Sequence, residues 1–180
     1  MKKHPGFSLI ELMIAMVIAG ILAGIAVPNV QRWQARDKFN AQALQVFQML
    51  DSARNNAIAE KKCPNGNLSV GWEFEITEES PRVIHLNCDD GTQKDVVEEM
   101  TFDPRIDIEP NSLSLPWDVA PTENTLRVYF FSGSVTPKIN DSFTTLSAKV
   151  PLISPLDLKK TLCLHRVSGI PSLTNNENCE

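Results

Sequence analysis

The sequence predicts an α+β protein in which a long N-terminal helix packs on a mostly antiparallel β-sheet head. Three observations lead to this prediction: an apolar run opens the chain, residues 29–62 repeat apolar side chains at three- and four-residue steps, and residues 63–180 change to a period of two. The first spacing places side chains on one face of a helix, and the second alternates them between the faces of a strand. No internal repeat interrupts this order, so we expect one domain carried on one long helix.

The apolar run extends from Phe7 to Val27, and Glu11 is its only charged residue. As a helix, these 21 residues span roughly 30 Å, the thickness of the hydrocarbon core of a bilayer. Residues 7–28 are therefore predicted to form a transmembrane helix. A carboxylate in the middle of a membrane costs about 2.5–3.5 kcal/mol. A simple anchor gains nothing from that charge, so Glu11 is expected to have a function and a charged partner.

Residues 1–6 form a short leader that contains two lysines and a histidine. Basic residues favour the cytoplasmic side of a membrane, which would leave the rest of the chain on the opposite side. Gly6 has no side chain and leaves room for a protease, and cleavage after it would expose the α-amine of Phe7 four residues from Glu11. A plain membrane anchor and a removed secretory signal remain as alternatives. The anchor explains neither Glu11 nor Gly6, and the apolar segment of a secretory signal is usually shorter.

The stretch GFSLIELMIAM, together with the run that follows it to Pro28, resembles the processing site of the type IV filament superfamily. This superfamily comprises type IV pilins and the pseudopilins of type II secretion. The resemblance implies cleavage between Gly6 and Phe7 by a prepilin peptidase, followed by methylation of the Phe7 amine. It also implies that Pro28 is the helix-breaking proline at which the helix bends or loosens.

The same resemblance implies where the protein goes and what it contacts. The chain would first span the bacterial inner membrane with its head in the periplasm, and the inner-membrane assembly machinery would then add it to a helical filament of other pilins at the cell surface. Glu11 would neutralise the N-terminal amine of a neighbouring subunit. Two opposite charges in a low dielectric are tolerable only as a pair, so this pairing would set the register of the subunits.

Residues 29–62 are predicted to form an amphipathic helix whose apolar face packs on the head. The apolar stripe contains Phe39, Ala43, Val46, Phe47, Leu50, Ala53 and Ala57. Basic and polar residues lie mostly on the other faces, so the stripe is typical of core packing. We expect the helix to end near Lys61 and Lys62, because two cations suit a helix C-terminus and the sequence Cys-Pro-Asn-Gly that follows cannot continue it.

Residues 63–180 are predicted to form a β-rich head. Five segments alternate or run apolar, and turn clusters separate them: NLSVGWEFEI, RVIHLN, LRVYFF, TTLSAKV and KTLCLHRV. A head of this length can bury one core. Residues 102–124 contain four prolines and are expected to form a loop that crosses the sheet edge. Trp72 is expected in the core and Trp33 at the membrane surface.

Four cysteines lie in the region expected in the periplasm, where disulfides persist. They allow three connectivities. Cys63 follows the helix and Cys88 follows the second predicted strand, so this pair would pin the helix end to the sheet. Cys163 and Cys179 would then join the last strand to the tail. That bond closes a loop of about 15 residues and is worth about 3 kcal/mol in the loop-entropy model.

The sequence offers no set of residues suited to catalysis, a metal or a cofactor. It contains no glycine-rich phosphate loop, HExxH or GxSxG motif, and we expect no enzyme activity. The cysteines lack the C-x-x-C or C-x-x-H spacing of zinc sites. Cys163 and His165 stand two residues apart without a third residue to orient them, which favours a structural role. Residues 89–92 are typical of a turn, and a calcium site there is the lesser alternative.

The head is acidic apart from one short basic segment. Residues 63–148 contain 15 acidic and 5 basic residues, a net charge of −10, whereas residues 149–166 contain four basic residues and one acidic residue. Lys159, Lys160 and Arg166 are the candidates for contacts with DNA phosphates. So few cations on an acidic head predict only weak, salt-sensitive binding, so DNA is not an expected partner.

Three segments of the head, GWEFEI, VYFFSGSVTP and TLCLHRVSGIPSL, resemble the GspH/FimT/FimU group of minor pilins and minor pseudopilins. DNA-binding members of the FimT type carry a Gly-Arg-x-Arg stretch after the last strand. Here Gly169 is followed by Ile, Pro and Ser, so neither arginine is matched. The resemblance therefore favours a FimU-like minor pilin, a structural subunit that links tip and shaft subunits of a type IV pilus. A minor pseudopilin of type II secretion and a DNA-binding minor pilin for transformation are the alternatives.

Overall fold

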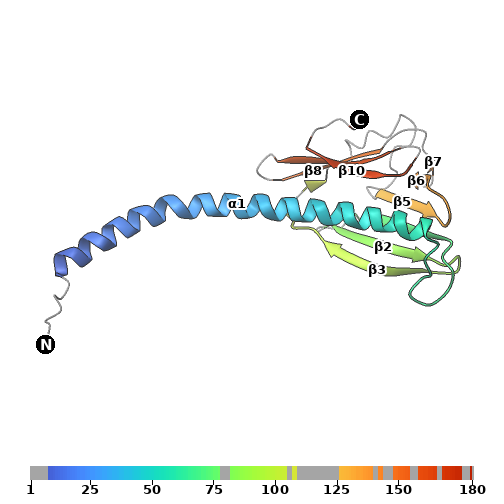
Figure 1. Ribbon diagram of the computed structural model, residues 1–180, viewed down its shortest axis with the longest axis horizontal. Helices are drawn as coiled ribbons and strands as arrows, with labels where there is room; N and C mark the ends of the chain where they lie inside the picture. Colours follow the sequence, from blue (N-terminus) through green and yellow to red (C-terminus); the bar gives the residue numbers. More distant parts are fainter. Residues whose placement is uncertain are drawn as a thin grey trace. The chain divides into compact units, whose positions relative to one another are not determined.

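The computed structural model describes residues 8–77, 82–104, 107–108, 126–139, 142–143, 148–154, 158–165, 168–175 and 179 (Figure 1). Within these residues one long helix, α1 (Leu9–Ile58), precedes the strands. The strands are β1 (Gly71–Ile76), β2 (Val83–Asp89), β3 (Lys94–Thr101), β4 (Asp107–Ile108), β5 (Leu126–Phe131), β6 (Pro137–Ile139), β7 (Ser142–Phe143), β8 (Ala148–Ile153), β9 (Lys159–Leu164) and β10 (Pro171–Thr174). The chain divides into two compact units, Met1–Lys38 and Phe39–Glu180.

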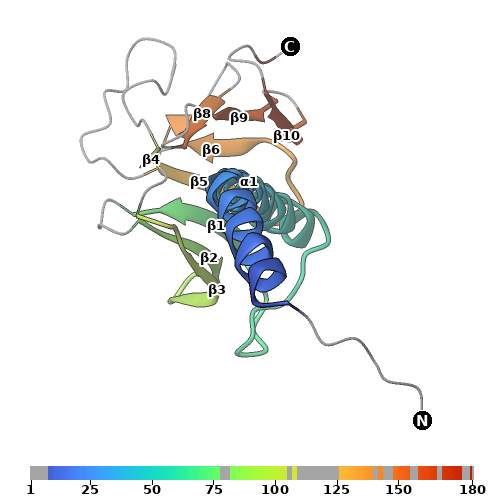
Figure 2. The same ribbon diagram turned by 90° about the vertical axis from the view of Figure 1, so that its left-hand side faces the viewer.

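The second unit contains the last part of α1 and two antiparallel sheets. The larger sheet has the order β3-β2-β1-β5-β6-β7, and the smaller one has the order β10-β9-β8-β4. Figures 1 and 2 show β2 and β3 on one side of α1, and β8 and β10 on another. The predicted α+β class is confirmed. The sequence had suggested a single sheet module, and the division into two sheets is a difference from that prediction.

The strand β1 lies at the centre of the larger sheet and shows why the alternating pattern GWEFEI forms a strand. Trp72 is opposite Cys88 of β2 and Phe130 of β5. The apolar side chains of β1 face the core, whereas Glu73 and Glu75 project from the other face. Gly71 is needed at the start of the strand, because a side chain there would collide with the ring of Tyr129.

One core joins the last part of α1 to both sheets. The helix contributes Phe39, Ala43, Val46, Met49, Leu50, Ala53 and Ala57, all buried. The larger sheet adds Trp72, Phe74 and Phe130, among others, and the smaller sheet adds Leu152 and Leu162. The predicted helix stripe is confirmed, with Phe47 partly buried against the core and Met49 as a member that the spacing did not indicate.

The helix ends earlier than predicted, at Ile58 instead of near Lys61 and Lys62. Glu60 has a φ of 48°, the left-handed conformation that terminates helices. The Glu60 N–H donates to the Ala57 carbonyl, and the Lys61 N–H donates to the Asn56 carbonyl. These two bonds form a Schellman motif. The left-handed conformation of Glu60 therefore ends the helix, although glycine is more common at this capping position.

The strands β1, β2, β5, β8 and β9 fall on the five predicted segments, although their bounds differ by a few residues. β3, β6, β7 and β10 were not predicted. β3 is largely exposed and rich in charge, so its sequence lacks the alternation by which the other strands were identified. β4 lies inside the predicted loop 102–124. Most of the remainder of that loop, residues 109–124, lies outside the described residues.

Candidate functional site

The first part of α1, residues 9–33, exposes apolar side chains from Leu9 to Leu22 and again at Val30 and Trp33. Exposed large apolar residues of this segment are Leu9, Ile10, Leu12, Met13, Ile14, Met16, Val17, Ile18, Ile21, Leu22, Val30 and Trp33. They lie on all faces of the helix, since they include consecutive positions. A helix that is apolar all round needs an apolar environment, so this segment is the first candidate for a functional surface.

Glu11 forms a hydrogen bond at the start of this helix. The Ser8 N–H donates to Glu11 Oε2 at 2.9 Å, and the Leu12 N–H donates to the Ser8 carbonyl at 3.2 Å. Ser8 is therefore the N-cap residue and Glu11 is the third helical residue, as in a capping box. This capping role was not predicted from the sequence, although the signal Ser-x-x-Glu before an apolar run is present. A carboxylate is also favoured at a helix N-terminus by the helix dipole.

Gly6 and Phe7, the predicted cleavage site, lie outside the described residues, so cleavage and methylation remain predictions. Pro28 lies within α1, whose backbone is helical from Leu9 to Ile58. The bend expected at Pro28 also remains a prediction. Within the part of the chain that the structure describes, no helix meets the length and hydropathy expected of a membrane span.

The two disulfides join the pairs that the sequence analysis favoured. Cys63 is bonded to Cys88 with a Cα–Cα distance of 5.6 Å, and Cys163 to Cys179 with a Cα–Cα distance of 5.7 Å. The first bond connects the segment after α1 to β2, and the second connects β9 to the tail. Cys163 is therefore not a free nucleophile beside His165, whose Nδ1 lies 3.2 Å from Ser168 Oγ.

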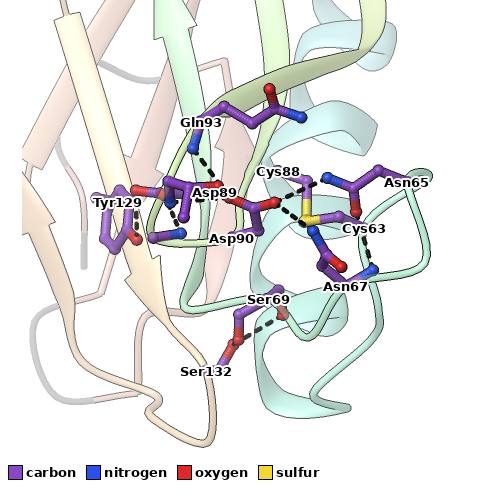
Figure 3. The surroundings of a disulfide bond; sticks show 12 residues. Cys63, Asn65, Asn67, Ser69, Cys88, Asp89, Asp90, Gln93, Tyr129 and Ser132 are labelled. Atoms are coloured by element: carbon purple, nitrogen blue, oxygen red, sulfur yellow. Dashed lines mark hydrogen bonds between the residues drawn. A yellow bond between two sulfur atoms is a disulfide. The ribbon is translucent and has the colours of Figure 1, made fainter.

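The carboxylate of Asp90 ties the segment after α1 to the turn between β2 and β3 (Figure 3). Its Oδ2 accepts hydrogen bonds from the side-chain amides of Asn65 and Asn67, each at 2.8 Å. Its Oδ1 accepts bonds from Thr92 Oγ1 at 2.6 Å and from the Thr92 and Gln93 N–H groups. The bond from the Thr92 hydroxyl is the largest of several that hold the pKa of Asp90 well below its ordinary value. The calcium alternative is not needed here, because the carboxylate already has protein donors on both oxygens.

Tyr129 of β5 contacts Asp89, the last residue of β2. Its hydroxyl donates to Asp89 Oδ2 at 3.0 Å, and its ring meets that of Phe131 edge-on with 4.9 Å between centroids. Burial raises the pKa of Tyr129 well above its ordinary value, and the charge of Asp89 raises it further. The tyrosine is therefore a neutral donor to Asp89 at physiological pH.

A cluster of charged side chains covers the outer face of β1, β2, β3 and β5. Lys94 Nζ lies 2.7 Å from Glu73 Oε2, and Arg127 Nε lies 2.7 Å from Glu75 Oε1. Asn87 lies between the two glutamates. This cluster was not predicted from the sequence, although one sign of it is visible there: Glu73 and Glu75 stand two residues apart and must share one face of a strand. Only the pairing of β1, β2, β3 and β5 brings these five residues together.

The basic segment near the C-terminus does not form a compact patch among the described residues. Lys159 and Lys160 are neighbours on β9, opposite Ile153 and Leu152 of β8. Adjacent residues of a strand point to opposite faces, so these two cations do not act on one surface. Arg166 lies outside the described residues. No group of three or more potential metal ligands is present in the described part of the chain.

Comparison with known proteins finds likeness both in the N-terminal helix and beyond it. A family model described as the prokaryotic N-terminal methylation motif matches residues 1–27. A fimbrial protein of Pseudomonas aeruginosa is 45% identical over 62 residues, which is 34% of this chain and 40% of the relative. The type IV major pilin protein PilA of Myxococcus xanthus (strain DK1622) is 44% identical over 59 residues, which is 33% of this chain but 26% of the relative. These matches therefore span less than half of the relatives' length.

A longer match extends into the head. A probable minor fimbrial protein of Dichelobacter nodosus is 31% identical over 141 residues, which is 78% of each chain. No solved structure matches the chain at a significant level. The methylation motif and the length of the minor fimbrial match together show that this chain belongs to the type IV pilin superfamily.

Proposed function

We propose that this protein is a non-enzymatic structural subunit of a type IV pilus, a minor pilin that enters the filament through the first part of α1. The observation that carries the proposal is the exposed apolar surface of that segment, which contains one carboxylate, Glu11. Such a surface needs an apolar cover. Lipid of the inner membrane would supply the cover before assembly, and the helices of other pilins would supply it in the filament.

The chemistry of the N-terminus supports this route. Cleavage after Gly6 by a prepilin peptidase would convert the leader into the free, methylated amine of Phe7 close to Glu11. In a low dielectric that carboxylate is stabilised by a cation, and the amine of a neighbouring subunit is the cation that assembly would bring. Among the described residues, the capping bond from Ser8 reaches Glu11 Oε2, and the proposed contact with the amine would use Oε1.

A minor rather than a major subunit is supported by the comparisons. The major pilin match is confined to 59 residues, whereas the probable minor fimbrial protein matches over 141 residues and must include much of the head. In this proposal the head lies at the filament surface and joins subunits of the tip to those of the shaft. The two disulfides suit a head that has moved to an oxidising compartment.

The test is the state and place of the mature chain. We expect sheared pili to contain this protein in small amounts, with an N-methylated Phe7 as its first residue in mass spectrometry. Gly6→Leu should keep the leader attached and the protein in the inner membrane. An intact Met1 on protein recovered from purified filaments would contradict the proposed processing.

A second measurement separates the pilus from type II secretion. Deletion of the gene should reduce surface piliation and leave the export of secreted enzymes unchanged. The opposite result would place the protein among the pseudopilins of type II secretion.

A further inference from the structure

An open cleft of about 350 Å³ lies on the outer face of the larger sheet, the face that carries Glu73 and Glu75. Its polar lining comes from four strands: Glu73, Glu75, His85, Asn87, Lys94 and Arg127. Val96 completes the lining from β3 and is itself 56% exposed. The cleft therefore reaches the edge of the sheet, where β3 is the last strand.

Asn87 is the unusual member of this cleft. Its side chain is buried, with 5% of the residue exposed, and its amide nitrogen donates to Glu73 Oε1 at 3.3 Å and to Glu75 Oε2 at 3.5 Å. The amide oxygen has no hydrogen-bond partner. An unpartnered buried polar atom costs about 1–3 kcal/mol. The two carboxylates set the orientation of the amide, so a donor must come to the oxygen from outside this network.

The surroundings favour a cation as that donor. Glu73 and Glu75 each accept one close charged contact, from Lys94 and Arg127 respectively. The bonds from Asn87 to their other oxygens are long. On β3, Glu99 shares the cleft face with His85 and lies 3.6 Å from it, whereas Asp95 and Glu98 are opposite Cys88 and Leu86 on the other face. The cleft face therefore has three carboxylates, those of Glu73, Glu75 and Glu99, against the two cations Lys94 and Arg127, and this balance favours a further positive charge.

The free edge of β3 is a place where a peptide that carries the positive charge can bind. Among the described residues β3 is paired with β2 alone. The free edge of a sheet presents unpaired N–H and C=O groups that can pair with an added strand. Val96 and Val97, both exposed, supply apolar contact along the same strand.

We propose that β3 and the cleft together bind an extended basic segment of another protein, which pairs along β3 and places an arginine or lysine side chain beside Asn87 and Glu75. The bound cation supplies the donor that the Asn87 oxygen lacks. This surface belongs to the head and does not depend on the proposed filament role, so the two proposals can fail separately.

The test uses the full chain in detergent micelles and two short synthetic peptides of β-prone residues, identical except that arginine alternates in one and glutamate in the other. Fluorescence anisotropy measures affinity, and amide hydrogen exchange locates the contact. We expect saturable binding of the arginine peptide with protection of β3 amides. Binding of the glutamate peptide should be at least about tenfold weaker, a difference of about 1.4 kcal/mol.

A matched pair of variants separates the cleft from general electrostatics. Glu99 faces the cleft side of the sheet opposite His85, whereas Glu98 is opposite Leu86 on the other side. Both are exposed, so Glu99→Lys and Glu98→Lys make the same charge change without disturbing the core. We expect Glu99→Lys to weaken binding of the arginine peptide about tenfold and Glu98→Lys much less. Equal loss in both variants, equal affinity for the two peptides, or no protection of β3 would overturn the proposal.

Discussion

The first part of α1 (residues 9–33) and its second part (residues 39–58) have the same secondary structure, but the second part packs on its own chain whereas the apolar side chains of the first part are exposed. Leu22 in the first part is 63% exposed, whereas Leu50 in the second part is 2% exposed. The second part packs on two sheets, and its buried residues follow the helical spacing of one face. The first part is apolar on all faces and exposes them. In the proposed function the first part packs on another molecule, whereas the second part already packs on the two sheets of the head.

The largest expected effect tests this division directly. Leu50→Ala should lower the free energy of unfolding of the head by about 3–5 kcal/mol, because it removes a buried side chain and leaves a cavity. Leu22→Ala, the same change in the exposed part, should leave that energy within about 0.5 kcal/mol of the wild type. Urea unfolding of the full chain in detergent, followed by near-ultraviolet circular dichroism, measures both. Equal destabilisation by the two changes would refute the division.

The next effect concerns the disulfide that follows α1. Replacing Cys63 and Cys88 by serine opens a loop with a sequence separation of 25 residues, and replacing Cys163 and Cys179 opens one of 16. Loop entropy predicts losses of about 3.5 and about 3 kcal/mol. The two double replacements should differ more in where hydrogen exchange increases than in how much stability is lost. Hydrogen exchange should increase in the last turns of α1 only for the first pair, and the same pattern for both pairs would show that the first bond does not hold the helix end.

Substitutions of Glu11 test whether the first part of α1 serves filament assembly. Glu11→Ala removes both the charge and the bond from Ser8, whereas Glu11→Gln removes the charge and keeps an oxygen that can accept the bond. Loss of the cap costs about 1 kcal/mol. If the carboxylate neutralises a neighbouring amine, both variants should be depleted in sheared pili while membrane levels stay normal. Normal incorporation of the Gln variant alone would assign Glu11 to capping.

The smallest expected effect is the pH dependence of the loop held by Asp90. Its pKa is lowered in the folded chain, so its contribution to stability is present above the unfolded pKa near 4 and is lost as the pH falls through the folded value. Asp90→Asn should therefore destabilise the head slightly at neutral pH, and the difference should vanish in strong acid. Thr92→Val keeps the carboxylate and removes the largest single cause of the shift. Unfolding midpoints measured across this pH range check both variants, and a constant difference at every pH would exclude the linkage.

Much of the fold could be predicted because local patterns were strong. The apolar run, the stripe from Phe39 to Ala57 and the alternation in GWEFEI each matched one period. β3 could not be found this way, because an exposed edge strand needs no apolar alternation. The end of α1 was placed too late because Glu60 adopts a left-handed conformation that its residue type does not favour.

The candidate sites also differ in whether the sequence alone reveals them. The sequence singled out Glu11 because a charge inside an apolar run is visible without any structure. The cleft beside Asn87 remained hidden because its members are spread from residue 73 to residue 127. No spacing in the sequence relates these residues.

The sequence by itself determined the long helix, its apolar first part with one carboxylate, the alternating strands and the acidic character of the head. These properties follow from residue type and local period, which do not depend on distant contacts. Only the tertiary structure decided that the strands separate into two sheets, that β3 forms an edge, and that Asn87 is buried between two paired glutamates. Those features arise from strand pairings between residues far apart in the chain, whose free energy no local pattern contains.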